Sequence, residues 1–84
     1  MYYTYILYSE SLRKYYVGHT KDLEKRFIEH NRAKSKYTRI GVPWKLVKYF
    51  QIETKAEANR LEIKIKQRGC KRFLDNLQKQ IKVL

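Results

Sequence analysis

Cysteine is almost absent from this sequence, because Cys70 is the only one among 84 residues. A single thiol can form no disulfide within the chain and cannot assemble a zinc site from several cysteines. The first residues also lack the basic segment, apolar run and small-residue cleavage site of a signal peptide. We therefore expect Cys70 to be structural and the chain to reside in a reducing cytoplasm.

Acidic residues and long apolar runs are also scarce. Eight Asp and Glu accompany 20 Lys and Arg, which gives a formal net charge of +12 and a pI near 10.0. Such a charge favours a polyanionic partner, either nucleic acid or an anionic membrane. Membrane binding would need a long apolar run or a helix with a basic face opposite aromatic residues, and the sequence offers neither. We expect nucleic acid as the partner, with no membrane and no obligate protein partner. Charge that only maintains solubility or suits contact with RNA stays open.

The residue pattern predicts one domain over residues 1–84, which is short for more than one hydrophobic core. Aromatic and β-branched residues fill Tyr2–Ser9 and Lys14–Thr20 on either side of a polar turn, a pattern typical of a β-hairpin. From Lys21 the apolar spacing becomes helical, and this helix should end near residues 31–34. Trp44–Ile52 is typical of a third strand.

Two further helices are predicted towards the C-terminus. Thr54 and Glu57 have the S/T-x-x-E spacing in which the two side chains satisfy backbone donors at a helix start. An apolar stripe within residues 58–65 continues this helix, and Gly69 is placed to end it. A second stripe within residues 73–81 predicts a third helix. The order β-β-α-β-α-α indicates an α+β fold, with a small three-stranded, mostly antiparallel sheet flanked by helices, but propensity does not fix the strand order.

Residues 34–43 show no sustained period and include a glycine and a proline, which predicts a basic loop. Its cations are Lys34, Lys36 and Arg39. Together with nearby aromatic residues, such a loop could follow a nucleic-acid backbone or stack on a base. Trp44 itself is expected in the core, since it opens an apolar strand.

A set of residues along the chain is similar to the motifs of one nuclease family. Tyr16-Val17-Gly18, followed by Arg26 and His30, resembles the YIG half-motif and next helix of GIY-YIG nucleases, and Glu62 resembles that family's later glutamate. Tyr3-Thr4-Tyr5 stands for the first half-motif and keeps only its final tyrosine. The resemblance runs from Tyr3 to about residue 67. It implies a small free-standing, metal-dependent endonuclease that hydrolyses DNA phosphodiester bonds.

The resemblance implies a role for each of five residues. Glu62 would hold Mg²⁺ or Mn²⁺, since a carboxylate is a hard oxygen ligand. Arg26 would contact phosphate through its planar guanidinium. Tyr5, or otherwise Tyr16, would take a proton from the attacking water, which requires positive charge to lower a phenol pKa of ordinarily about 10. His30 would contact phosphate or relay a proton.

Further residues are expected to bind the nucleic-acid backbone. They are His19, Lys21, Lys34, Lys36 and Arg39. Ordinary roles compete with the functional ones: strand tyrosines usually pack across a sheet, and Glu62 could pair with Lys66 one helical turn away. The two histidines and Glu62 do not have the HExxH spacing of a zinc site.

Two other functions stay open on the sequence alone. One is a non-catalytic nucleic-acid-binding module that retains the fold, and the other is an interaction protein with an acidic partner. The joint presence of Tyr5, Tyr16, Arg26, His30 and Glu62 favours the enzyme, because simple backbone binding requires only cations.

Overall fold

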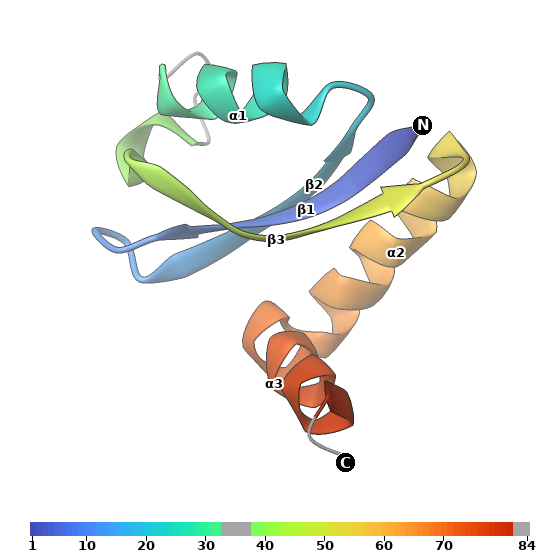
Figure 1. Ribbon diagram of the computed structural model, residues 1–84. Coiled ribbons are helices and arrows are strands. Elements are labelled where there is room, and N and C mark those ends of the chain that lie inside the picture. The colour runs from blue at the N-terminus through green and yellow to red at the C-terminus, as the bar shows by residue number, and fades with distance from the viewer. Residues whose placement is uncertain (33–37, 82–84) are drawn as a thin grey trace.

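An antiparallel sheet separates one helix on its upper face from two helices on its lower face in Figure 1. The computed structural model describes residues 1–32 and 38–81. The strands are β1 (Tyr2–Ser9), β2 (Lys14–Thr20) and β3 (Trp44–Ile52). The helices are α1 (Leu23–Asn31), the short 3-10 helix η1 (Arg39–Gly41), α2 (Lys55–Arg68) and α3 (Cys70–Ile81). The predicted fold class and element order are confirmed, except that the expected basic loop contains the helical turn η1.

The sheet has the order β2-β1-β3, so the first strand lies in the centre and both neighbours run antiparallel to it. In its register, Tyr5 lies opposite Gly18 on one side and Tyr49 on the other. Successive strand residues face opposite sides of a sheet. Tyr5 and Leu7 therefore face α1, whereas Ile6 faces α2.

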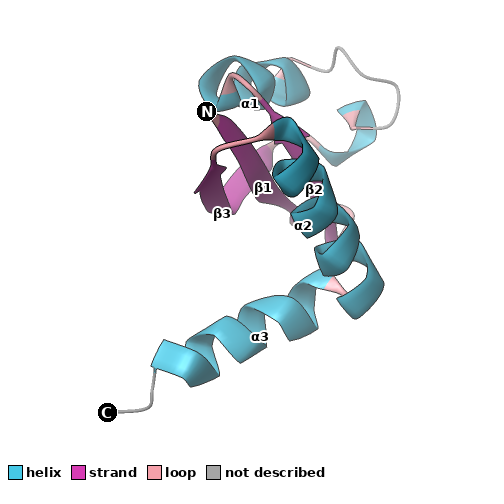
Figure 2. Cartoon of the chain, turned by 90° about the vertical axis from the view of Figure 1, so that its right-hand side faces the viewer, coloured by secondary structure: helices cyan, strands magenta, loops and turns pink. Residues whose placement is uncertain are grey.

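Each face of the sheet has its own apolar cluster. On the α1 side, Tyr5, Leu7 and Trp44 are buried and pack with half-buried Tyr16, Leu23, Phe27 and Val42. On the other side, Ile6, Val17 and Ile65 are buried and pack with half-buried residues of β3, α2 and α3. Figure 2 shows α2 lying against the sheet and α3 leaving it at an angle. The two clusters fix α1 and α2 on opposite faces of one sheet.

Both ends of α2 follow the predicted capping residues. The Thr54 hydroxyl accepts a hydrogen bond from the Glu57 N–H and donates one to the Glu57 carboxylate, which starts α2. Gly69 ends α2 with a φ of 93°, a conformation that side chains disfavour. Asp22 caps α1 by accepting from the Lys25 N–H at 3.1 Å. A cap of this kind typically stabilises a helix by about 1 kcal/mol.

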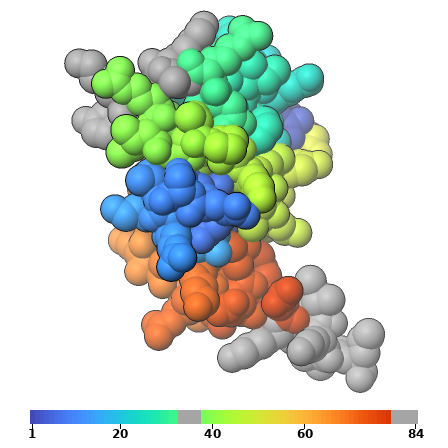
Figure 3. All heavy atoms as spheres, turned by 90° about the vertical axis from the view of Figure 1, so that its left-hand side faces the viewer, coloured from blue at the N-terminus to red at the C-terminus, as the bar shows by residue number. Residues whose placement is uncertain are grey.

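Trp44 anchors the start of β3 beneath the end of α1. Its N–H donates to Asn31 Oδ1 at 2.6 Å, its carbonyl accepts from Asn31 Nδ2, and its indole N–H donates to the Thr38 carbonyl. The side chain is 4% exposed, which confirms the expectation that it belongs to the core. Figure 3 shows this end of the molecule, where the blue hairpin turn lies between the green start of β3 and the orange helices.

Across residues 1–32 and 38–81, we find no helix whose length and hydrophobicity would let it span a bilayer.

Candidate active site

Gly18 lets the Tyr5 side chain lie across β2. A Cβ atom at position 18 would be 2.6 Å from the Tyr5 Oη atom and 3.2 Å from the Tyr16 ring. Contacts this short require a shift of the neighbouring atoms, so glycine is the residue that fits this approach. The atom that packs closest to Gly18 is the candidate catalytic hydroxyl of Tyr5.

Tyr5, Tyr16 and His30 form a cluster between the sheet and α1. The Tyr5 hydroxyl lies 3.0 Å from His30 Nε2, and the Tyr16 and His30 rings meet edge to face with centroids 4.9 Å apart. Tyr5 and His30 are buried, with 1% and 3% of their surfaces exposed, whereas Tyr16 is half-buried. The helical spacing of His30 in α1 thus carries it to the hydroxyl predicted to act as the base.

Burial controls the protonation of this cluster. It lowers the pKa of His30 from its usual 6.5, and the Arg26 charge lowers it further, with partial opposition from Glu29. Burial also raises the pKa of Tyr5, as does Tyr16, and Arg26 offsets only part of this rise. Both groups are therefore neutral near pH 7, and one hydrogen bond joins the Tyr5 hydroxyl to His30 Nε2. In the chain itself, desolvation outweighs the lowering of the Tyr5 pKa by Arg26. The expected lowering also relied on the charge of a bound Mg²⁺, so it stays a prediction.

His30 also has an unused polar atom. When Nε2 accepts from Tyr5, Nδ1 of the neutral ring carries the proton. Among the described residues, this buried Nδ1 has no hydrogen-bond partner. An unpaired buried polar group typically costs about 1–3 kcal/mol, which makes His30 an unfavourable choice for packing alone.

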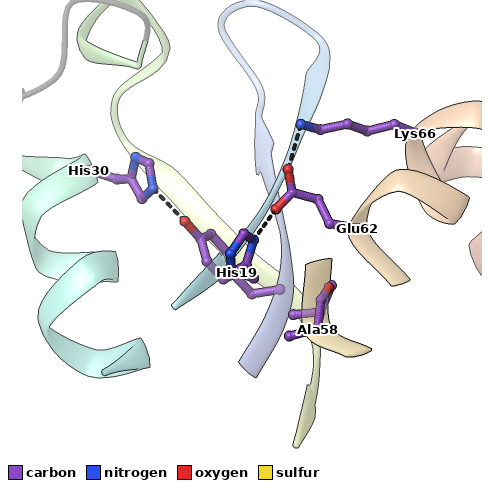
Figure 4. A network of polar contacts seen from close by, with 7 residues as sticks. His19, His30, Ala58, Glu62 and Lys66 are labelled. Carbon is purple, nitrogen blue, oxygen red and sulfur yellow. Dashed lines mark hydrogen bonds and ion pairs between the residues drawn. The ribbon is translucent and has the colours of Figure 1, made fainter. Parts of the chain in front are cut away.

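Glu62 lies on the opposite face of the sheet, at the border of α2 and β2. Its Oε1 is 2.6 Å from His19 Nδ1, and its Oε2 is 2.6 Å from Lys66 Nζ (Figure 4). The Thr4 hydroxyl donates to the Ala58 carbonyl at 2.8 Å and ties α2 to β1 one turn before Glu62. On the sequence alone, Lys66 was the ordinary ion-pair partner expected for Glu62, and the structure contains this ion pair.

The carboxylate of Glu62 is held in its ionised form. Burial would raise its pKa, but the hydrogen bonds from Lys66 and His19 outweigh burial and lower it. The ionised Glu62 carboxylate has the charge and the hard oxygen atoms that a divalent metal requires. Its Oε2 atom already binds one cation, the Lys66 ammonium. Within the described part of the chain, no group of three or more His, Cys, Asp or Glu is arranged to hold a metal. A metal here would have one protein carboxylate, with water and phosphate as its other ligands.

A cationic pocket of about 520 Å³ opens between the start of α1, the end of β2 and the start of α2. Its cations are Lys21, Lys25, Arg26 and Lys55, and His19 also lines it. Asp22 and Glu29 add negative charge to its wall. Arg26 is 46% exposed and lies 3.5 Å from Glu29, so its guanidinium is accessible to a phosphate. Lys25 and Lys55 were not predicted, because an isolated lysine gives no sequence signal.

The predicted backbone-binding residues divide into three groups. His19 and Lys21 line the cationic pocket. Arg39 begins η1 with an exposed side chain and does not line that pocket. Lys34 and Lys36 lie outside the described residues.

The catalytic candidates form two groups that meet around the end of β2. Tyr5, Tyr16 and His30 face α1, whereas Glu62 approaches from α2 and contacts His19. The groups are close enough that the negative charge of Glu62 raises the pKa of Tyr5. The sequence order alone did not show that these residues would lie on two faces of one sheet.

Comparison with known proteins identifies the family of this chain. The sequence profile of the GIY-YIG catalytic domain matches residues 1–73. This chain belongs to the GIY-YIG family. The site residues named above lie within the matched segment.

Relatives within the GIY-YIG family include several UPF0213 proteins. The chain is 46% identical over 52 residues to one from Staphylococcus saprophyticus, covering 61% of this chain and 63% of that relative, which is less than two thirds of its length. It is 43% identical over 54 residues to one from Halobacterium salinarum, covering 63% and 70% of the two chains. The solution structure of a UPF0213 protein from Bacillus halodurans is similar over 98% of this chain and 86% of that one, with 32% identity and a TM-score of 0.54.

Proposed function

We propose that this GIY-YIG protein is a divalent-metal-dependent endonuclease that hydrolyses DNA phosphodiester bonds. The observation that carries the proposal is the contact between the Tyr5 hydroxyl and a buried, neutral His30, beside a cationic pocket that holds Arg26. A packing role explains a buried tyrosine. It does not require a buried, neutral imidazole at hydrogen-bond distance from the hydroxyl of that tyrosine.

In this mechanism, Tyr5 and His30 act as a proton relay. As Tyr5 takes a proton from the attacking water, its own proton moves to His30 Nε2 along the 3.0 Å contact. A free phenolate is not needed, so the raised pKa of Tyr5 is compatible with its role as a base. Tyr5 is 1% exposed, whereas Tyr16 is half-buried. The cleavage rates of Tyr5→Phe and Tyr16→Phe, compared with that of the parent, identify the hydroxyl that serves as base.

Arg26 and Glu62 serve the phosphate in the proposed reaction. The exposed guanidinium of Arg26 binds a phosphoryl oxygen and offsets its charge. Glu62 would hold the divalent ion, and His19 orients its carboxylate through Oε1. When bound, the metal supplies charge stabilisation at the phosphate and the leaving oxygen.

One observation favours a second candidate, a DNA-binding module without catalysis. Both oxygens of Glu62 already have partners within the chain, so the residue has a structural role that needs no metal. This alternative keeps the cationic pocket and predicts DNA binding without cleavage.

Glu62→Gln separates the two functions, since it removes the charge while keeping the size of the side chain. We expect it to abolish Mg²⁺-dependent cleavage while DNA affinity, measured in EDTA, changes by less than about threefold, because it removes no phosphate contact. Single-stranded, duplex and branched DNA would serve as substrates. Glu53→Gln is the matched control, because Glu53 is exposed and lies outside the helices. Equal cleavage by the Glu62 variant and the parent would exclude the proposed metal site, and a parent that binds but never cuts would favour the binding module.

A further inference from the structure

An apolar groove lies between α1 and the edge of β3, separate from the residues assigned to catalysis. It measures about 790 Å³, and its apolar lining comes from Tyr3, Leu23, Phe27, Leu46 and Tyr49. Tyr49 is 51% exposed and Leu46 is 38% exposed, which is high for large apolar side chains. We call this set of residues the Tyr49 groove.

The Tyr49 ring is placed to receive a flat partner. Tyr3 meets it in an edge-type contact, at an interplanar angle of 63° with ring centroids 6.1 Å apart, and the Tyr49 side chain stays half exposed. In the described sheet, β3 is an outer strand, and the ring therefore lies at the sheet edge. Stacking of a base on an aromatic side chain contributes about 1–3 kcal/mol and tolerates any base.

We propose that the Tyr49 groove binds an unpaired nucleobase of single-stranded DNA. The base belongs to the same strand whose phosphate occupies the cationic pocket, so the assignment of substrate class rests on the proposed nuclease function. A base paired within a duplex is already stacked on its neighbours and cannot enter a groove of this kind without leaving the stack. The groove thus selects DNA with an unpaired segment.

The position of the groove supports this assignment. It shares Lys21 and Asp22 with the cationic pocket, so the two sites meet at the start of α1. Tyr49 also lies in one cross-strand row with Tyr5 and Gly18. Because adjacent strands are about 4.8 Å apart, this row spans roughly 10 Å. Because the two sites share Lys21 and Asp22, a strand with a phosphate at the cationic pocket can place a nearby base in the Tyr49 groove.

The charges around the groove favour a base over a phosphate. Asp22 and Glu24 line it together with Lys21, so a second phosphate would meet two carboxylates. Carboxylates accept hydrogen bonds from the amino groups of bases, whereas they repel phosphate. With a net charge of +12 on the chain, the partner remains a polyanion, and the groove receives its uncharged part.

The test compares binding of oligonucleotides in EDTA, where no metal-dependent cleavage occurs. The probes are a fluorescein-labelled oligothymidine, an abasic strand of the same length, and a duplex. We expect Tyr49→Ala to weaken oligothymidine binding about 5- to 100-fold, by loss of one stacked base. Abasic and duplex affinities should change less than about twofold.

Tyr15→Ala is the matched control, because Tyr15 is 37% exposed, lies on the other outer strand and packs on Tyr8. It should leave all three affinities unchanged. Tyr49→Phe should retain oligothymidine binding and Tyr49→Leu should lose it. This pair separates stacking from simple hydrophobicity and does not depend on the alanine variant folding.

Equal affinities of the Leu and Phe variants for oligothymidine, or equal losses on the abasic strand, would overturn the proposal in favour of another occupant such as an apolar protein side chain. Because binding is measured without cleavage, a base-dependent Tyr49 effect in a chain that never cuts DNA would reject the nuclease function and keep the groove.

Discussion

At the scale of single residues, Glu62 shows how one side chain can satisfy two interpretations. The sequence allowed it to be a metal ligand or the partner of Lys66, and the structure pairs it with Lys66 while keeping its carboxylate ionised. An exposed ion pair is typically worth about 0–1 kcal/mol, so a divalent ion can displace the flexible ammonium at small cost. Lys66 is 56% exposed and has room to move. The observed pair is therefore compatible with the proposed site.

This competition predicts that Lys66→Met tightens metal binding. Removal of the ammonium frees Oε2 and also removes repulsion of the incoming ion, so we expect Mg²⁺ affinity to rise by about two- to tenfold. Chemical-shift titration of the backbone amides around Glu62 measures the effect without DNA. Lys64→Met removes the same charge from an exposed position of α2 and should leave the affinity nearly unchanged. Identical titrations for the two variants would show that Lys66 does not compete with the metal.

His30 predicts a pH dependence of stability. Its pKa is lowered in the folded chain, chiefly by burial and then by Arg26, while Glu29 opposes the shift. The unfolded chain thus binds the proton more readily, and stability is complete above a pH of about 6.5 and falls as the pH drops below that value. Urea titrations at pH 7.5 and 5.0 should show this loss in the parent and less of it in His30→Gln. Tyr5, which also contacts the ring, stays neutral in this range because burial raises its pKa. A variant with the parental pH dependence would assign the loss to other groups.

At the scale of secondary-structure elements, the sequence predicted the order and bounds of the strands and helices better than it predicted the contacts within the candidate site. Strand alternation, the Thr54 cap and Gly69 marked their elements, because these signals are local and depend on neighbouring residues. The central position of β1 depends on long-range pairing with β3, which propensity does not encode. The same limit applied to the contacts of His30 with Tyr5 and of Glu62 with His19, whose partners are 25 and 43 residues apart.

Gly18 links the hairpin to the site, and this predicts the effect of Gly18→Ala. The new methyl group would lie 2.6 Å from the Tyr5 hydroxyl, so Tyr5 must move and its contact with His30 must lengthen. Overpacking of this kind typically costs about 1–3 kcal/mol. We expect a fall of that size in the free energy of unfolding and a loss of cleavage that exceeds the loss of DNA affinity. If Gly18→Ala cuts DNA at the parental rate, the position of the Tyr5 hydroxyl does not matter for the reaction.

At the scale of the whole molecule, the charge of +12 predicted a polyanionic partner without showing where it binds. The structure gathers Lys21, Lys25, Arg26 and Lys55 around one pocket, although they come from a loop and two helices far apart in sequence. Other basic residues lie elsewhere, such as Lys45, which pairs with Glu10. Part of the positive charge therefore lies in the pocket beside the candidate site, and the rest lies elsewhere on the surface.

This distribution predicts the salt dependence of DNA binding. If about four to six phosphates are neutralised, the logarithm of affinity for duplex DNA should fall against the logarithm of salt concentration with a slope of about −4 to −5. Replacement of Lys21, Lys25 and Lys55 by glutamine should make the slope shallower by up to about one unit per lost phosphate contact, with little dependence on base sequence. Arg39→Gln, outside the pocket, tests whether the loop that precedes β3 also contacts the backbone. A triple variant with the parental slope would place the DNA on a different surface, and the cationic pocket would then have no part in holding the substrate.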